Sequence, residues 1–497
     1  MTEQNNTAAL EEAPNSFAVR WTLAGLSLSM LLSSLGTSIA NVALPTLTQT
    51  FDASFQEVQW VVLAYLLAIT TLIVSAGRLA DIIGPRRLLL LGIILFTAAS
   101  ALCGAAPTLW LLIAARTVQG LGAAIMMTLS MAFVGETIPK SKTGSAMGLL
   151  GTTSAIGTAL GPSLGGVLIS GIGWRAVFLV NVPLGVVTAA LAFHNLPADR
   201  LKRKDDKASF DNLGTLLLVL TLGTYALAMT VGGGNFGSIN AALLLVAFFG
   251  AGLFVLAQAK ASSPLIRLKI FRDLDLSVGL ATSALVSTVL MTTLVIGPFY
   301  LSLGLGLDTA FVGILMSVGP LVVALAGMPF GRLVDNLGAE RMTILGLVGI
   351  MVASVTLALI PASFGGITGY IIPIVVLTLG YAMFQTANNT FMMRDVQPDQ
   401  RGVISGMLNL SRNLGLITGA SVMGAIFAFA SGKSDIGGVH EEAVAAGMRI
   451  TFVVAAVLIA VALAIVVGKR VFTLPISEKA RLIGSEANSK TIKIALR

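Results

Sequence analysis

Two near copies decide the fold of this chain: GRLADIIGPRR at residues 77–87 and GRLVDNLGAER at residues 331–341. The glycines, the first and last arginines, the leucine and the aspartate recur at the same spacing, 254 residues apart. Each copy lies between two long apolar segments. A duplicated, charged hinge between membrane spans indicates two similar halves that move against each other, which is how a transporter is organised.

The composition of the chain is that of a membrane protein. Of its 497 residues, 56% are hydrophobic and only 11% are charged, whereas soluble domains are roughly 25% charged. The net charge of +8 does not indicate a nucleic-acid partner, because the basic residues are scattered over short loops. Cys103 is the single cysteine, and His194 and His440 fall in loops, so we expect no disulfide, metal site or cofactor.

Apolar segments of about 20 residues predict fourteen membrane spans. Lys and Arg concentrate in the loops on one side, and the opposite loops hold only Arg175 and Lys433, with Arg449 near the membrane edge. This bias predicts an integral, lipid-embedded protein of the cell (inner or plasma) membrane with both termini in the cytoplasm. Residues 1–16 have no signal-peptide pattern. The predicted spans are 18–44, 57–77, 87–106, 108–134, 144–170, 174–194, 212–232, 239–259, 276–300, 309–331, 342–361, 367–391, 403–430 and 447–468.

A second duplication supports the division into halves. When 144–166 is aligned with 402–424 at a shift of 258, five glycines coincide. The predicted fold is therefore all-α, with two six-helix pseudo-repeat bundles and an inserted two-helix hairpin, and substrate binds between such halves. The expected parts are a cytoplasmic tail (1–17), the first bundle (18–194), a basic linker (195–211), the hairpin (212–259), a second linker (260–275), the second bundle (276–468) and a basic cytoplasmic tail (469–497).

Several motifs make the chain resemble the major facilitator superfamily, in its fourteen-helix drug:proton antiporter branch. They are the paired loop motif, RTVQG at 116–120, GTALGPSLGG at 157–166, ANVALP at 40–45, WVVLAYLL at 60–67 and GWRAVFLVNVPLG at 173–185. These motifs are specific for the branch and much less so for the cargo.

The resemblance implies that the paired motifs are gating latches, in which Asp81 meets the start of span 403–430 and Asp335 the start of span 144–170. A motif that only sets topology would account for its arginines but not for two aspartates at one spacing. The predicted latch residues are Gly77, Arg78, Asp81, Gly84, Arg87, Gly331, Arg332, Asp335, Gly338 and Arg341. The antiporter motif, which the resemblance makes a seal between the halves, comprises Gly157, Gly161, Pro162, Gly165 and Gly166; ordinary small-residue helix packing is the alternative.

Two arginines, Arg116 and Arg412, are predicted to lie within spans, where a charge needs a partner or a watery cavity. For Arg116, proton coupling or anion contact and a structural bond to backbone carbonyls both stay open. Arg412 either lines the cavity or locks the bundle. Further candidates for the substrate cavity, for which packing is the alternative where they are aromatic or methionine, are Asn41, Met126, Thr292, Tyr300, Tyr381, Gln385, Asn388 and Asn409.

The chain departs from the branch at one position. The branch typically has an aspartate shortly before NVALP, and here that position is Gly36. None of the 23 acidic residues falls near the middle of a predicted span. This weakens the case for a cationic cargo and favours an anionic or zwitterionic one, which can itself carry a proton.

These observations predict a secondary active transporter that exports small amphipathic or anionic molecules in the manner of multidrug efflux. We expect alternating access, protons as the coupling ion, a functional monomer and no catalytic residues. The chain has no GxxxxGK[ST] loop of an ATPase. One alternative is a dedicated metabolite or siderophore exporter with narrow specificity. Another is a transport-inactive membrane sensor or scaffold that retains the fold. The second is disfavoured because both copies of the latch motif keep their glycines, arginine and aspartate.

Overall fold

The computed structural model describes residues 16–73, 75–137, 143–197, 199, 211–231, 237–261, 264, 265, 268, 272–359, 366–393, 401–431 and 441–473. Within these residues all regular structure is helical, and thirteen helices are long and apolar enough to cross a membrane. The predicted span 144–170 corresponds to the 29-residue helix α7 (Thr143–Gly171). The fourteen predicted spans are therefore all present as helices.

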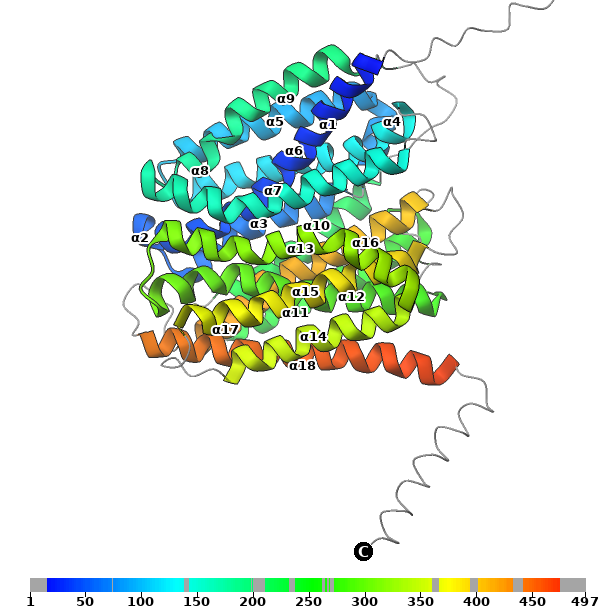
Figure 1. Cartoon of the computed structure of the whole chain (residues 1–497). Coiled ribbons are helices and arrows are strands. Elements are labelled where there is room, and N and C mark those ends of the chain that lie inside the picture. Colours follow the sequence, from blue (N-terminus) through cyan, green and yellow to red (C-terminus); the bar gives the residue numbers. More distant parts are fainter. Residues whose placement is uncertain are drawn as a thin grey trace, which may run out of the picture.

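The first half forms the upper layer in Figure 1 and the second half the lower layer. Besides α7, the first half consists of α1 (Ser16–Ser38), η1 (Asn41–Ala43), α2 (Leu44–Phe51), α3 (Phe55–Ile73), α4 (Ala76–Ile83), α5 (Pro85–Ala105), α6 (Leu109–Thr137), α8 (Ala176–Leu179) and α9 (Asn181–Asn195). The second half consists of α12 (Leu274–Phe299), η3 (Tyr300–Gly304), α13 (Thr309–Leu337), α14 (Ala339–Leu359), α15 (Gly366–Met393), α16 (Arg401–Thr418), η4 (Gly419–Met423), α17 (Gly424–Ala430) and α18 (Glu441–Thr473).

Glycine contacts repeat between the halves and confirm the duplication. A Cβ added at Gly92 would crowd Ile125 and the Gly122 carbonyl, so α5 and α6 cross closely there. In the second half, Gly346 and Gly380 bring α14 and α15 together in the same way. The two pairs are 254 and 258 residues apart, the shifts of the sequence repeats.

The inserted hairpin, α10 (Asn212–Thr230) and α11 (Ser238–Lys260), is bonded to both halves. On the side of the first half, Trp60 Nε1 donates to Thr230 Oγ1 at 3.0 Å. On the side of the second half, the Tyr225 hydroxyl donates to Thr418 Oγ1 at 3.2 Å. The hairpin thus lies along the seam between the two halves.

The latch motifs are more helical than the sequence suggested. Gly77 lies within α4 and Gly331 within α13, and the chain turns only at the second glycine of each copy. Gly84 has φ +101° and Gly338 has φ +84°, which glycine adopts without strain. The expected glycine-rich loop is therefore a helix end followed by a one-residue turn.

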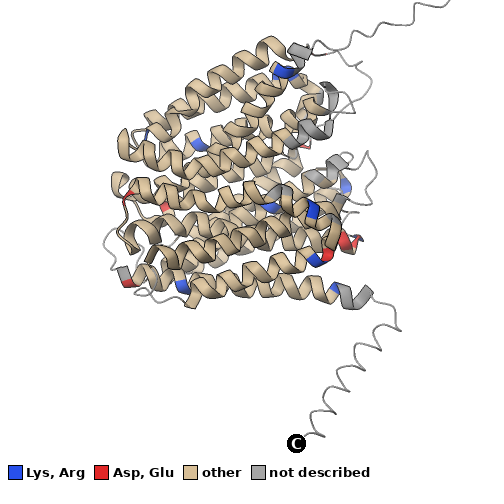
Figure 2. Cartoon of the chain, viewed as in Figure 1, with Lys and Arg blue, Asp and Glu red and all other residues tan. Residues whose placement is uncertain are grey.

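Charged residues lie mainly at the two ends of the bundle (Figure 2). We call the end with α2, α8 and α17 the outer end and the end with α4 the inner end, following the predicted orientation. In the described part of the chain, each acidic residue lies in a connection or in the first or last turn of a helix.

Candidate functional site

The guanidinium of Arg116 is completely buried inside the first half and all three of its nitrogens donate hydrogen bonds. Nε donates to the Val61 carbonyl at 2.8 Å, Nη1 to Gln119 Oε1 at 2.6 Å and Nη2 to the Gly36 carbonyl at 3.1 Å. Its Cζ lies 4.0 Å from the centroid of the Tyr65 ring. The partial charges of two carbonyls and one amide oxygen, together with an aromatic face, therefore stabilise this cation.

Gly36 contributes a carbonyl at the position where the resemblance led us to expect a carboxylate. A Cβ added there would lie 2.8 Å from the Tyr65 hydroxyl oxygen and 3.3 Å from the Phe96 ring. Tyr65 is itself fixed, because its hydroxyl donates to the Ser33 carbonyl at 2.8 Å. An acidic side chain at this position would have to displace the stacked tyrosine.

Arg412 differs from Arg116 in both exposure and bonding. It lies on α16, eleven residues after the first residue of that helix, and is half-buried. No hydrogen bond or ion pair joins it to another described residue. The neighbouring Ser411 hydroxyl donates to the Leu280 carbonyl at 2.5 Å, so α16 is held against α12 there. Arg412 is thus a half-buried cation on a helix that is held against α12.

The other cavity candidates divide into two groups. Asn41, Met126, Thr292, Tyr300, Tyr381 and Asn388 are buried in the packing, and Asn388 donates to the Gly279 carbonyl at 3.2 Å. Gln385 and Asn409 keep partial exposure, as Arg412 does. Of these eight predicted lining residues, only Gln385 and Asn409 are partly exposed.

An acidic residue outside the first latch motif, which the sequence analysis missed, forms hydrogen bonds to it. Asp199 accepts hydrogen bonds from Arg86 N at 2.8 Å and Arg87 N at 3.3 Å, and so caps the N-terminus of α5. Arg87 Nε lies 3.9 Å from the same carboxylate. Pro85, at the first position of α5, signals a helix start, but nothing local shows that the cap comes from beyond α9.

The remaining latch residues are less informative. The side chains of Arg78, Asp81 and Asp335 lie outside the described residues, so their predicted partners stay a prediction. Arg332 and Arg341 are exposed. No described atom lies within 4 Å of a Cβ added at Gly77, Gly331 or Gly338.

The glycines of the antiporter motif contact two different helices. Gly157, Gly161 and Gly165 approach α1, at Leu31 and Ser38, and the following η1, at Val42. On the opposite side, Gly166 meets the backbone of α13, and a Cβ added there would lie 2.6 Å from the Thr309 carbonyl and 2.9 Å from Gly313 Cα. A Cβ on Gly313 would collide with the carbonyl of Pro162. The motif therefore brings the two halves into backbone contact near the outer end.

Comparison with known proteins agrees with this architecture. The sequence model described as Major Facilitator Superfamily matches residues 26–420. Riboflavin transporter RibZ of Clostridioides difficile (strain 630) is 30% identical over 403 residues, which are 81% of this chain and 87% of RibZ. Multidrug resistance protein Stp of Mycobacterium tuberculosis (strain CDC 1551 / Oshkosh) is 31% identical over 411 residues, which are 82% of this chain and 75% of Stp.

Two solved structures share the fold. The first is a bacterial homologue of the human lysosomal transporter Spinster, with a TM-score of 0.65 and 16% identity over 91% of this chain and 97% of that one. The second is the nucleoside transporter NupG, solved as a point mutant, with a TM-score of 0.62 and 12% identity over 91% of this chain and 99% of that one.

Proposed function

This chain belongs to the major facilitator superfamily, and we propose that it exports small amphipathic or anionic molecules across the cell membrane by alternating access. It is a multi-pass membrane transporter of small molecules. The proposal adds the direction, the charge of the cargo, cytoplasmic termini, proton coupling and action as a monomer.

The contrast between the two intramembrane arginines carries the charge preference. Arg116 is fully bonded and buried, whereas Arg412 is half-buried and has no partner among the described residues. A guanidinium offers donors whose geometry matches a carboxylate, sulfonate or phosphate. No described acidic residue lies in mid-span, so the described spans offer no carboxylate to pair with a cationic cargo.

The same distribution of charges bears on the coupling ion. An antiporter that binds a proton on the protein needs a titratable group that alternately faces both sides, and a mid-span carboxylate would serve. The described spans offer none. We therefore propose that exchange for an inward-moving proton does not rest on a mid-span carboxylate, and that the anionic cargo leaves in its charged form.

Export and broad specificity are supported by similarity. The motif at Gly157–Gly166 resembles that of antiporters, and relatives include proteins named for multidrug resistance. A narrow metabolite exporter is the second candidate, favoured by the relative named a riboflavin transporter.

The decisive experiment measures binding of fluorescein, an anion, and rhodamine 6G, a cation, to the purified protein. We expect tighter binding of fluorescein by at least about tenfold, and loss of that preference in Arg412→Ala. Arg449→Ala, at an exposed arginine near the outer end, is the matched control and should bind as wild type does. Tighter binding of rhodamine 6G, or an unchanged preference in Arg412→Ala, would refute the charge assignment.

A further inference from the structure

A single aromatic side chain of the first half closes the outer end against two of the second half. Phe55 begins α3, and its ring centroid lies 4.7 Å from that of Phe299 at the end of α12. It lies 5.5 Å from that of Phe427 in α17. All three rings are fully buried. Phe55 must therefore leave this cluster whenever the halves separate at the outer end.

One turn further along α3, Gln59 forms a hydrogen bond between the halves. Its Nε2 donates to the Ala420 carbonyl at 2.9 Å, whereas its buried Oε1 has no hydrogen-bond partner among the described residues. Ala420 lies in η4, a single π-helical turn that interrupts the helix between α16 and α17; such turns are frequent at functional sites. A Cβ on Gly424 would collide with the Gln59 amide. The bond thus depends on a local distortion and on a glycine, both in the second half.

Gln56 lies between these two residues in the sequence and differs from Gln59 in its bonding. It is 2% exposed, and neither its Oε1 nor its Nε2 has a hydrogen-bond partner among the described residues. Gln56 and Gln59 are three residues apart and so lie on the same face of the helix. An amide that is buried without partners is costly, and regains its hydrogen bonds when water reaches it.

We propose that these residues form the outer gate and that the gate is balanced by opposing contributions. Phe55 and Gln59 stabilise the closed outer end, and Gln56 destabilises it because its amide is bonded only after the outer end opens. The opposition keeps the closed state from becoming so stable that the cycle stops. This inference goes beyond the proposed function, because it concerns the conformational equilibrium and holds for any cargo and either direction of transport.

The test measures the separation of the halves at the outer end without any substrate. Spin labels are attached to Thr50→Cys and Phe429→Cys, two exposed positions in the first and second half, in a Cys103→Ala background that removes the native thiol. Phe55→Ala and Gln59→Leu should each raise the ratio of long to short label distances, by roughly five- to tenfold for a lost hydrogen bond. Gln56→Leu should lower the same ratio by a similar factor.

The proposal predicts that substitutions of two glutamines on one helix face change the distance ratio in opposite directions. Where the wild-type ratio is too low for a decrease to be measured, Gln56→Leu is combined with Phe55→Ala and should reverse its effect in part. Phe452→Ala, at an equally buried aromatic residue of α18, is the control and should leave the distances unchanged. Phe55→Met replaces Phe55→Ala should the latter fail to fold.

Three results would overturn the gate. Gln56→Leu could leave the ratio unchanged or raise it in the Phe55→Ala background, in which case Gln56 does not oppose closure. Gln59→Leu could leave the distances at their wild-type values. Phe55→Ala and Phe452→Ala could shift them equally, which would make the aromatic cluster ordinary packing.

Discussion

The backbone carbonyl of Gly36 accepts a hydrogen bond of 3.1 Å from Nη2 of Arg116, across the interface between α1 and α6. This bond joins the buried cation to the residue at which the resemblance led us to expect an aspartate. The first half therefore keeps its buried cation and stabilises it with oxygens from the backbone and from Gln119.

Gly36→Ala should destabilise the protein by about 1–3 kcal/mol, because the new methyl group would overlap the Tyr65 hydroxyl. Tyr65→Phe removes that hydroxyl, so the double variant should lose less stability than the sum of the two single variants. Thermal unfolding of the purified proteins measures this coupling. Strict additivity would show that the two side chains do not meet.

Arg116→Lys should be poorly tolerated although it keeps the charge. Lysine is a compact ammonium that cannot reproduce three bonds in the plane of a guanidinium, and the Val61 and Gly36 carbonyls would lose their donor. We expect a loss of about 3–5 kcal/mol in the free energy of unfolding. Arg412→Lys is the matched comparison and should unfold within about 0.5 kcal/mol of wild type, since Arg412 has no partner among the described residues. Equal destabilisation would contradict the contrast between the two arginines.

Gly84→Ala should cost more stability than Gly338→Ala. Both positions have positive φ, so both substitutions strain the backbone. Only Gly84 is also approached by a side chain, the Asp199 carboxylate that caps α5. In an Asp199→Ala background, which itself should lose about 0.5–2 kcal/mol with the cap, the two glycine substitutions should have similar effects on the melting temperature. A persistent difference would mean that Asp199 does not confine Gly84.

Gly313→Ala should weaken the contact between the halves at the outer end, because its methyl group would press on the Pro162 carbonyl and Gly166 Cα. We expect a loss of about 1–3 kcal/mol and slower transport by reconstituted protein. Gly151→Ala lies on the same helix as Gly166, where no described atom is within 4 Å of an added Cβ. This control should be neutral or gain up to about 1 kcal/mol, and a loss as large as that of Gly313→Ala would refute the explanation.

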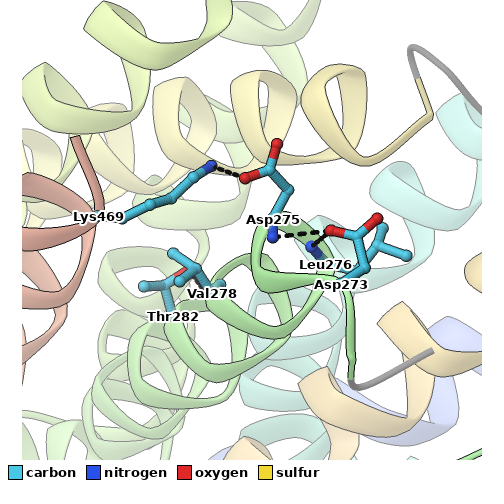
Figure 3. Close-up of polar contacts among 6 residues, drawn as sticks. All are labelled: Asp273, Asp275, Leu276, Val278, Thr282 and Lys469. Atoms are coloured by element: carbon cyan, nitrogen blue, oxygen red, sulfur yellow. Dashed lines mark hydrogen bonds and ion pairs between the residues drawn. The ribbon is translucent and has the colours of Figure 1, made fainter. Parts of the chain in front are cut away.

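Lys469, near the end of α18, forms an ion pair with Asp275 at the start of α12. Its Nζ lies 2.5 Å from Asp275 Oδ1, in the first turn of α12, where Asp273 accepts bonds from the backbone nitrogens of Asp275 and Leu276 (Figure 3). The same ammonium lies 4.3 Å from the centroid of the Phe391 ring. Because Asp275 is about half exposed, Asp275→Asn should cost at most about 1 kcal/mol, less at high salt. Lys469→Met should cost more, since it also removes the contact with Phe391, and the two melting temperatures compared at low and high salt test this order.

Much of the fold could be predicted from the sequence, because each span is a local property. A run of about 20 apolar residues must be helical in lipid to satisfy its own backbone groups. Shared spacing alone revealed the duplication, and the glycine pairs at 92/122 and 346/380 show it in three dimensions. The same local reasoning placed Arg116 inside a span but could not say what bonds it.

The long-range contacts could not be predicted, because their partners are far apart in the chain or belong to the backbone. Two of the groups that accept hydrogen bonds from Arg116 are backbone carbonyls. Every residue has a carbonyl, so the sequence GTSIAN at 36–41 does not indicate which carbonyl is the acceptor. Asp199 lies more than a hundred residues after the start of the helix that it caps. Gln59 and Ala420 are 361 residues apart.

The paired motifs at 77–87 and 331–341, with the apolar runs around them, by themselves determined a membrane transporter of two related halves. They did so because the length of an apolar segment and the spacing of a repeat can both be read from the order of the residues. Only the tertiary structure decided that Arg116 is bonded to carbonyls, that Arg412 is half-buried with no bonded partner among the described residues, and that the Phe55 ring packs against those of Phe299 and Phe427. Burial and hydrogen bonding depend on which helices pack together, and that packing exists only in the folded protein.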